Sequence, residues 1–272
     1  MKARSRRLTR QDIDFLIETV SPEARDRSEM ARVLEEDPDF RKSYIGDERV
    51  FRRAMNDEEV LVRVSPALFF EILLRRTADD LEAAGYTIER TQAMKIPVFD
   101  APAVSGLLAR EPVLLYLADM LSSFTRIESY TIPVLVGKRI WKKIRFNDLD
   151  IQGLMSVCDV VDEEVRLGFY KRIADICLFV LGVFPDYAEQ DYRYPLSRQV
   201  RPHLRGKMRI APEEYEREGR KFYKLAAEHA SAREFELSPV FEILHQEFAR
   251  ARKPLNFLSE HYLQTTRQKL FV

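Results

Sequence analysis

Glycine, cysteine and long apolar runs are all scarce in this sequence. Only 9 of the 272 residues are glycine, which disfavours glycine-rich loops and frequent tight turns. The two cysteines, Cys158 and Cys177, belong to no CxxC pair, so we expect reduced, buried thiols and no structural zinc site. The sequence contains no GxSxG, GxGxxG, Walker A or HExxH motif, and therefore none of these signatures of catalytic or nucleotide-binding sites.

An apolar segment long enough to cross a membrane is also missing. The most apolar stretch, residues 176–184, would form about 14 Å of helix, whereas a bilayer requires about 20 apolar residues. The basic residues at the N-terminus are followed by polar residues and not by an apolar segment, so they form no secretory signal. We therefore expect a cytoplasmic protein without a membrane partner.

Neither sign of charge is in excess. Lys and Arg total 44, and Asp and Glu also total 44, so bulk charge gives no reason to expect nucleic acid or acidic membranes as partners. The residues that are abundant suit a large folded core, since 46% are hydrophobic and 32% are charged. Frequent leucine, arginine, glutamate and alanine favour helix.

Apolar periodicity and capping residues predict a mainly α fold. The clearest signals are Thr9 and Ser21 as N-caps, Pro22 as a first-turn proline followed by the favourable acid Glu23, and Gly85 as a C-cap. Helices are expected after Thr9 and over residues 21–36, 47–84 (divided near 65–66), 101–122 (interrupted near 111–112), 148–161, 163–184, 212–230, 238–252 and 255–264, with a break at 253–254.

One segment carries a clear β signal. Residues 130–136 and 139–146 flank Gly137-Lys138, which suits a two-residue hairpin turn that places Val134 and Ile132 across from Trp141 and Lys143. Residues 86–100 show no assignable periodicity. A long polar loop is expected over residues 185–211, either as a functional segment or as a surface excursion.

The predicted fold class is thus mainly α: a multi-helix, bundle-like single domain with one small β-hairpin near residues 130–146. We expect residues 1–45 to form peripheral N-terminal helices. Residues 46–272 are expected to form one co-folded helical domain.

The first candidate site is basic. No acidic residue lies between Glu128 and Asp148, and this span holds the only tryptophan. A basic hairpin with an aromatic residue can follow a phosphate backbone and stack on a base; ordinary solvated charge is the alternative. With two arginines of the long loop, the candidate nucleic-acid-binding residues are Lys138, Arg139, Trp141, Lys142, Lys143, Arg145, Arg201 and Arg205.

The second candidate site combines histidines with a carboxylate. Glu242 and His245 have the i, i+3 spacing found in di-metal carboxylate bundles, although such bundles contain the pair twice. His229 and His261 each follow a glutamate and complete the set. A metal- or ligand-binding bundle built on these residues is one hypothesis, and a histidine satisfied by a single hydrogen bond is the other. No cofactor is otherwise predicted.

The third candidate is Asp175, at the point where the helix over residues 163–184 changes from amphipathic to apolar on every side. A carboxylate at that depth must be paired or change its pKa. It is therefore either the wall of a pocket or the partner of Lys171 or Arg172, which lie four and three residues earlier.

Four segments occur together in this chain: SPALFFEILLRR (65–76), GFYKRIADICLFVLGVFP (168–185), GRKFYKLAAEH (219–229) and LSEHYL (258–263). Together they resemble an uncharacterised family of bacterial hypothetical proteins. The resemblance covers most of the chain after about residue 45 and implies one long co-folded unit. That family has no assigned activity, so no functional residue is carried over from it.

The leading hypothesis from the sequence is a cytoplasmic helical scaffold or protein-interaction module without catalysis of its own. Its partner would be another protein or a second copy of the chain. A nucleic-acid-associated protein is the first alternative, and the metal- or ligand-binding bundle is the second.

Overall fold

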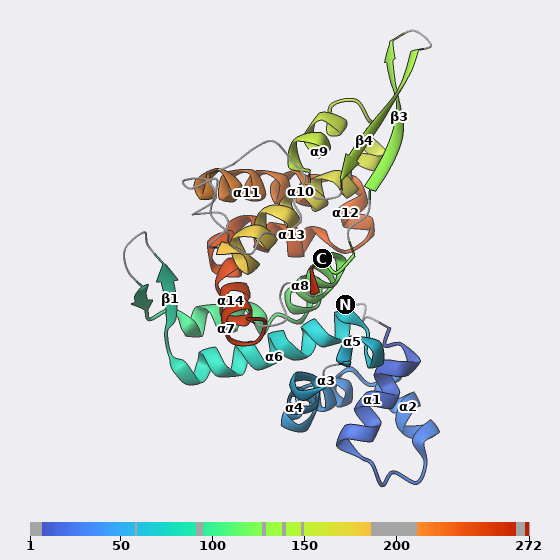
Figure 1. Ribbon diagram of the computed structural model, residues 1–272, viewed down its shortest axis with the longest axis vertical. Helices are drawn as coiled ribbons and strands as arrows, with labels where there is room; N and C mark the ends of the chain where they lie inside the picture. Colours follow the sequence, from blue (N-terminus) through green and yellow to red (C-terminus); the bar gives the residue numbers. More distant parts are fainter. Residues whose placement is uncertain are drawn as a thin grey trace. The chain divides into compact units, whose positions relative to one another are not determined.

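The computed structural model describes residues 7–57, 59–90, 95–126, 129–137, 140–147, 150–185, 211–264 and 270–271. Most of these residues are helical (Figure 1). The chain forms two compact units, Met1–Ser122 (unit 1) and Ser123–Val272 (unit 2). The mainly α fold with a hairpin near residues 130–146 is confirmed. The boundary expected near residue 45 stays a prediction.

Short helices with polar caps open unit 1. They are α1 (Arg10–Val20), α2 (Arg27–Glu36), α3 (Pro38–Ile45), α4 (Glu48–Asn56) and α5 (Val60–Arg63). Thr9 caps α1 as predicted. The helix predicted from residue 21 begins later, because Asp26 and not Ser21 accepts the amide hydrogen bond that starts α2; the Ser21 hydroxyl bonds to the Tyr44 hydroxyl instead, at 2.7 Å.

Helix α6 (Pro66–Ala84) begins and ends at the predicted residues. The Ser65 hydroxyl accepts a hydrogen bond from the Leu68 amide, and Gly85 ends the helix with a φ of 74°, a left-handed conformation that glycine adopts without strain. The buried carboxylate of Asp12 joins α1 to the start of α6, since it accepts hydrogen bonds from the Ser65 amide and hydroxyl at 2.7 and 2.9 Å.

A hairpin follows α6 in the region that shows no assignable periodicity. It consists of β1 (Thr87–Arg90) and β2 (Lys95–Val98), paired antiparallel. Helices α7 (Ala101–Leu108) and α8 (Glu111–Ser123) come next, and their break agrees with the predicted interruption. The buried Arg75 guanidinium of α6 binds Glu71 at 2.8 Å and also Glu111, so an ion triad joins α6 to the start of α8.

Unit 2 begins with the predicted hairpin, whose strands are β3 (Ser129–Gly137) and β4 (Ile140–Asn147). The predicted pairing was wrong by one residue. Val134 pairs with Lys142 and Leu135 with Trp141, while Gly137 pairs with Ile140. The register shifts between Leu135 and Gly137, which is the mark of a β-bulge: one extra residue on β3 moves the remaining pairs by one position.

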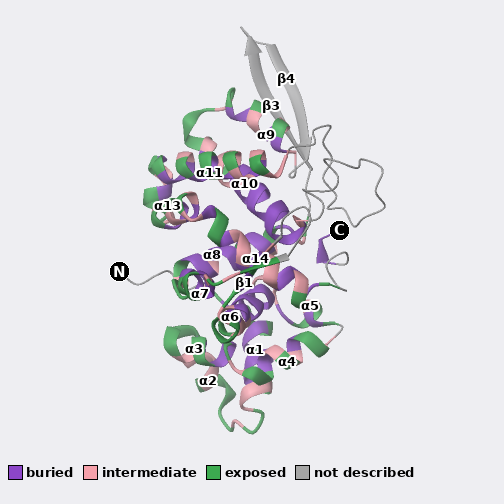
Figure 2. Ribbon diagram, turned by 90° about the vertical axis from the view of Figure 1, so that its left-hand side faces the viewer, coloured by how far each residue is buried: buried purple, intermediate pink, exposed green. Residues whose placement is uncertain are grey.

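Helix α10 (Glu163–Val183) is the central helix of unit 2. Every residue from Ile173 to Val183 is buried (Figure 2), as the uniformly apolar second half predicts. Helices α9 (Ile151–Cys158), α11 (Pro212–Glu228) and α14 (Phe248–His261) pack against it. At Gly182 a Cβ atom would lie 2.7 Å from the Leu255 side chain, so the glycine permits the close approach of α14.

The C-terminal helices break at a different residue from the predicted one. Short α12 (Ala230–Glu234) precedes α13 (Ser238–Gln246), and the break falls at Glu247, while Pro254 lies inside α14. A proline inside a helix costs about 3 kcal/mol. Phe248, Ala251, Leu255 and Leu258 are fully buried along one face of α14, so burial of this continuous stripe outweighs that local cost.

Within the described residues, no helix combines the length and the apolar character needed to cross a bilayer.

Candidate interaction surfaces

The most exposed large apolar side chain in the described part of the chain is Phe99, which is 83% accessible. It directly follows β2; Tyr86, which directly precedes β1, and Ile88 on β1 are each 42% accessible. The rings of Tyr86 and Phe99 meet edge to face with their centroids 6.4 Å apart. Exposed aromatic groups that contact each other form a patch, and a patch is more informative than scattered exposed residues.

Strand register gathers these side chains on one face of the hairpin. Ile88 pairs with Pro97, and continuing the ladder by two residues sets Tyr86 opposite Phe99. All four residues are exposed. We call Tyr86, Ile88, Pro97 and Phe99 the β1–β2 face. None of its members is charged.

The opposite face of this hairpin anchors it to unit 1. Thr87, which pairs with Val98, is 4% accessible, and its hydroxyl donates a hydrogen bond to the Asp100 carboxylate just before α7. Gly85 fixes the direction in which the chain leaves α6. The β1–β2 face is therefore held on a hairpin that is tied at its base to two helices.

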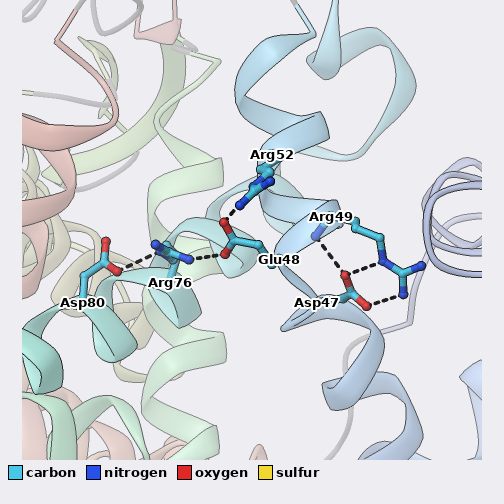
Figure 3. Close-up of polar contacts among 6 residues, drawn as sticks. All are labelled: Asp47, Glu48, Arg49, Arg52, Arg76 and Asp80. Atoms are coloured by element: carbon cyan, nitrogen blue, oxygen red, sulfur yellow. Dashed lines mark hydrogen bonds and ion pairs between the residues drawn. The ribbon is translucent and has the colours of Figure 1, made fainter.

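A chain of charged side chains links α4 to α6 (Figure 3). Glu48 accepts hydrogen bonds from Arg52 at 2.9 Å and from Arg76, and Arg76 also contacts Asp80 at 2.8 Å. Arg76 lies over the Phe51 ring as well, 5.0 Å from its centroid. These partly exposed groups are matched charge for charge, so we assign this network a structural role in unit 1.

The neighbouring pair Asp47 and Arg49 caps the start of α4 (Figure 3). The Asp47 carboxylate accepts hydrogen bonds from the Arg49 guanidinium at 2.6 and 2.9 Å and from the Arg49 amide at 2.8 Å. Hydrogen bonding to this guanidinium holds the pKa of Asp47 below its usual value.

Asp175 is fully buried and paired. Its Oδ2 accepts a hydrogen bond from Lys171 Nζ at 2.6 Å, one turn earlier on α10, and its Oδ1 accepts the Tyr223 hydroxyl of α11 at 2.8 Å. The predicted intrahelical partner is thus Lys171. Arg172 instead donates to the Ser123 hydroxyl and lies over the Phe124 ring, 4.0 Å from its centroid. Asp175 ties α10 to α11 through Tyr223.

The histidines of the metal hypothesis bond to separate backbone carbonyls. His245 donates to the Arg220 carbonyl and His261 to the Phe257 carbonyl, each at 2.9 Å, while Glu242 accepts from Gln246. Within the described residues, no three His, Cys, Asp or Glu side chains gather as metal ligands would. The structure does not bring Glu242, His245, His229 and His261 together.

His229 is buried and has a defined tautomer. Its Nδ1 accepts the Ser231 amide at 3.2 Å and caps α12, so the proton lies on Nε2, which donates to the Glu163 carbonyl of α10 at 2.8 Å. The Glu163 carboxylate lies 3.8 Å from Nε2. This histidine joins the start of α10 to the junction of α11 and α12.

Both cysteines are buried free thiols. Burial raises the pKa of Cys158 to about 11, and it also raises the pKa of Cys177, with the carboxylates of Glu218 and Asp175 adding to the effect. A raised thiol pKa reduces the thiolate population, so neither cysteine has the character of a nucleophile at neutral pH.

The structure describes the basic candidate residues only in part. Trp141, Lys142, Lys143 and Arg145 have defined backbone positions on β4. Lys138, Arg139, Arg201 and Arg205 lie outside the described residues.

The β1–β2 face was not predicted from the sequence. The available signal was the run of β-favouring residues on both sides of residues 91–94, in particular Tyr86-Thr87-Ile88 and Ile96-Pro97-Val98. Comparison of the chain with protein-family models, with curated proteins and with solved structures gives no match.

Proposed function

We propose that this protein is a cytoplasmic, non-catalytic helical scaffold that assembles with a second copy of itself through the β1–β2 face. The observation that carries the proposal is the exposure of Phe99, at 83%, next to Tyr86 and Ile88 on an anchored hairpin. Two buried, unpaired thiols fit a reducing compartment such as the cytoplasm.

Exposure of this kind favours association. Removing apolar surface from water contributes about 25 cal/mol per Å², and aromatic pairs add about 0.5–1.5 kcal/mol through their geometry. The Thr87–Asp100 hydrogen bond and the Gly85 cap hold the hairpin before any partner arrives. Less conformational freedom is therefore lost on binding.

A second copy of the chain is the occupant that suits this face best. The face carries no charge, so it offers no charge complementarity that would select a different partner. A twofold axis needs only one self-complementary patch, and apolar aromatic residues are complementary to themselves. Among the described strands, β1 and β2 form a sheet of two, so each has one side without a strand neighbour that a second hairpin could extend.

The predicted dimer is weak. Four residues are far fewer than the roughly 20–30 that line each side of a standard interface, so residues around the hairpin must contribute and the dimer should dissociate on dilution. Such reversible assembly suits a scaffold.

Chemical cross-linking tests where the copies meet. We would place a cysteine on the face with Pro97→Cys and treat the full chain with a short bismaleimide; buried Cys158 and Cys177 should not react. A covalent dimer is expected. The matched control is Val62→Cys on α5, an exposed apolar position at 73% accessibility outside the face. Equal dimer yields from the two variants would contradict the proposal.

A further inference from the structure

The corrected register of the second hairpin separates its residues into two unlike sets. Alternate residues of a strand share a face, and paired residues share it too. One set consists of Thr131, Pro133 and Leu135 with their partners Arg145, Lys143 and Trp141. The other consists of Tyr130, Ile132 and Val134 with their partners Phe146, Ile144 and Lys142.

The first set contains two cationic side chains and the indole of Trp141. Trp141, Lys143 and Arg145 occupy every second position of β4, so successive members are separated by about 7 Å along the strand. In the register expected from the sequence alone, Ile132 and Val134 shared their face. In the observed register Pro133 and Leu135 are instead the partners of Lys143 and Trp141, and no acidic residue belongs to either strand.

The second set is apolar except for Lys142. Antiparallel sheets with one buried and one solvated face show this kind of division. By its composition, the set with Trp141 is the one that suits a polyanionic ligand, and Lys142 is a basic residue of the same strand in the other set.

We propose that the β4 residues Trp141, Lys143 and Arg145 bind single-stranded nucleic acid. An indole can stack on an unpaired base, and cations spaced along an extended strand can contact successive phosphates of an extended polynucleotide. Bases inside a duplex are stacked on each other and offer no free face to the indole, so a single strand is favoured. Because the chain has zero net charge, bulk charge adds no attraction to that of this segment, and binding should weaken as salt rises.

Fluorescence titration of the full chain tests this inference, since Trp141 is the only tryptophan. Oligothymidylate or oligouridylate should quench its emission at low salt, and the quenching should disappear as salt rises. Lys143→Gln should reduce the salt slope by about 0.7, which corresponds to roughly fivefold weaker binding at about 0.1 M salt. Arg145→Gln should behave alike.

Lys142→Gln is the matched control, because it removes the same charge from the neighbouring position of the same strand. Equal losses with Lys142→Gln and Lys143→Gln would overturn the assignment of the face and indicate general charge attraction. The absence of quenching by either oligonucleotide at low salt would overturn the inference altogether. So would quenching by phosphatidylserine vesicles without quenching by the oligonucleotides, which would identify a membrane surface instead.

Discussion

Replacing Gly219 with alanine should destabilise unit 2, although alanine is the better helix former. Gly219 lies inside α11, where its side of the helix faces α14 and α10. A Cβ atom there would lie 2.4 Å from Phe248 Cε2 and 2.9 Å from Cys177 Cβ. Both contacts are shorter than van der Waals separation, so at least one neighbour must move.

Neither neighbour can move freely. The Phe248 side chain is fully buried and its ring contacts the Tyr223 ring, with centroids 6.1 Å apart. Cys177 Cβ is attached directly to the backbone of α10. Overpacking a core costs about 1–3 kcal/mol. Because the added Cβ atom would make two short contacts, we expect a cost at the upper end of this range for Gly219→Ala. The higher helix propensity of alanine offsets about 1 kcal/mol of this cost. The net loss in the free energy of unfolding is therefore about 2 kcal/mol.

Gly168→Ala on α10 is the control, since an added Cβ atom there meets nothing within 4 Å. This exposed helical position should gain about 0.5–1 kcal/mol. Urea unfolding followed by circular dichroism would measure both variants. The packing of α11 against α10 and α14 would be refuted if Gly219→Ala were as stable as Gly168→Ala.

Three further changes test other contacts of unit 2. Tyr223→Phe removes a donor from the buried Asp175 carboxylate and should cost about 1.5–3 kcal/mol in urea unfolding; an unchanged midpoint would show that this hydrogen bond is dispensable. His229→Ala should cost about 1 kcal/mol more than His229→Asn, because asparagine can still cap α12; equal stability of the two variants would argue against the capping role. Because the folded pKa of Cys177 is raised, the buried neutral thiol contributes fully to the free energy of unfolding below the unfolded thiol pKa of about 8.5, and this contribution is lost as pH rises above that value. Cys177→Ala should therefore lose less stability than wild type between neutral and strongly alkaline pH. Parallel pH profiles of the two proteins would contradict this.

The sequence predicted those parts of the fold that depend on local signals. Thr9 and Gly85 set helix ends through hydrogen bonds or backbone conformation within a few residues, and both predictions were confirmed. Pro254 shows where local rules fail, because burial of the surrounding apolar stripe keeps α14 continuous through a residue that normally ends a helix.

Candidate sites were predictable to the same limited extent. The partner of Asp175 on its own helix, Lys171, follows from the i, i+4 spacing, whereas Tyr223 lies 48 residues away and only the packing of α11 brings it near. The register of β3 and β4 depends on a bulge that no residue type in the two strands predicts. Exposure of Phe99 could not be predicted, since the sequence does not show which of its apolar side chains the packing leaves at the surface.

Self-association through the β1–β2 face is the central claim, and sedimentation equilibrium over a range of concentrations tests it most directly. Wild-type protein should show a reversible monomer–dimer equilibrium. Phe99→Lys should shift it strongly toward monomer, because it replaces the most exposed apolar group with a charge that would meet its own copy across a twofold axis. Val62→Lys, the control outside the face, should sediment as wild type does. A wild-type protein that remains monomeric at every concentration, or a Phe99→Lys variant that dimerises as strongly as wild type, would contradict the account.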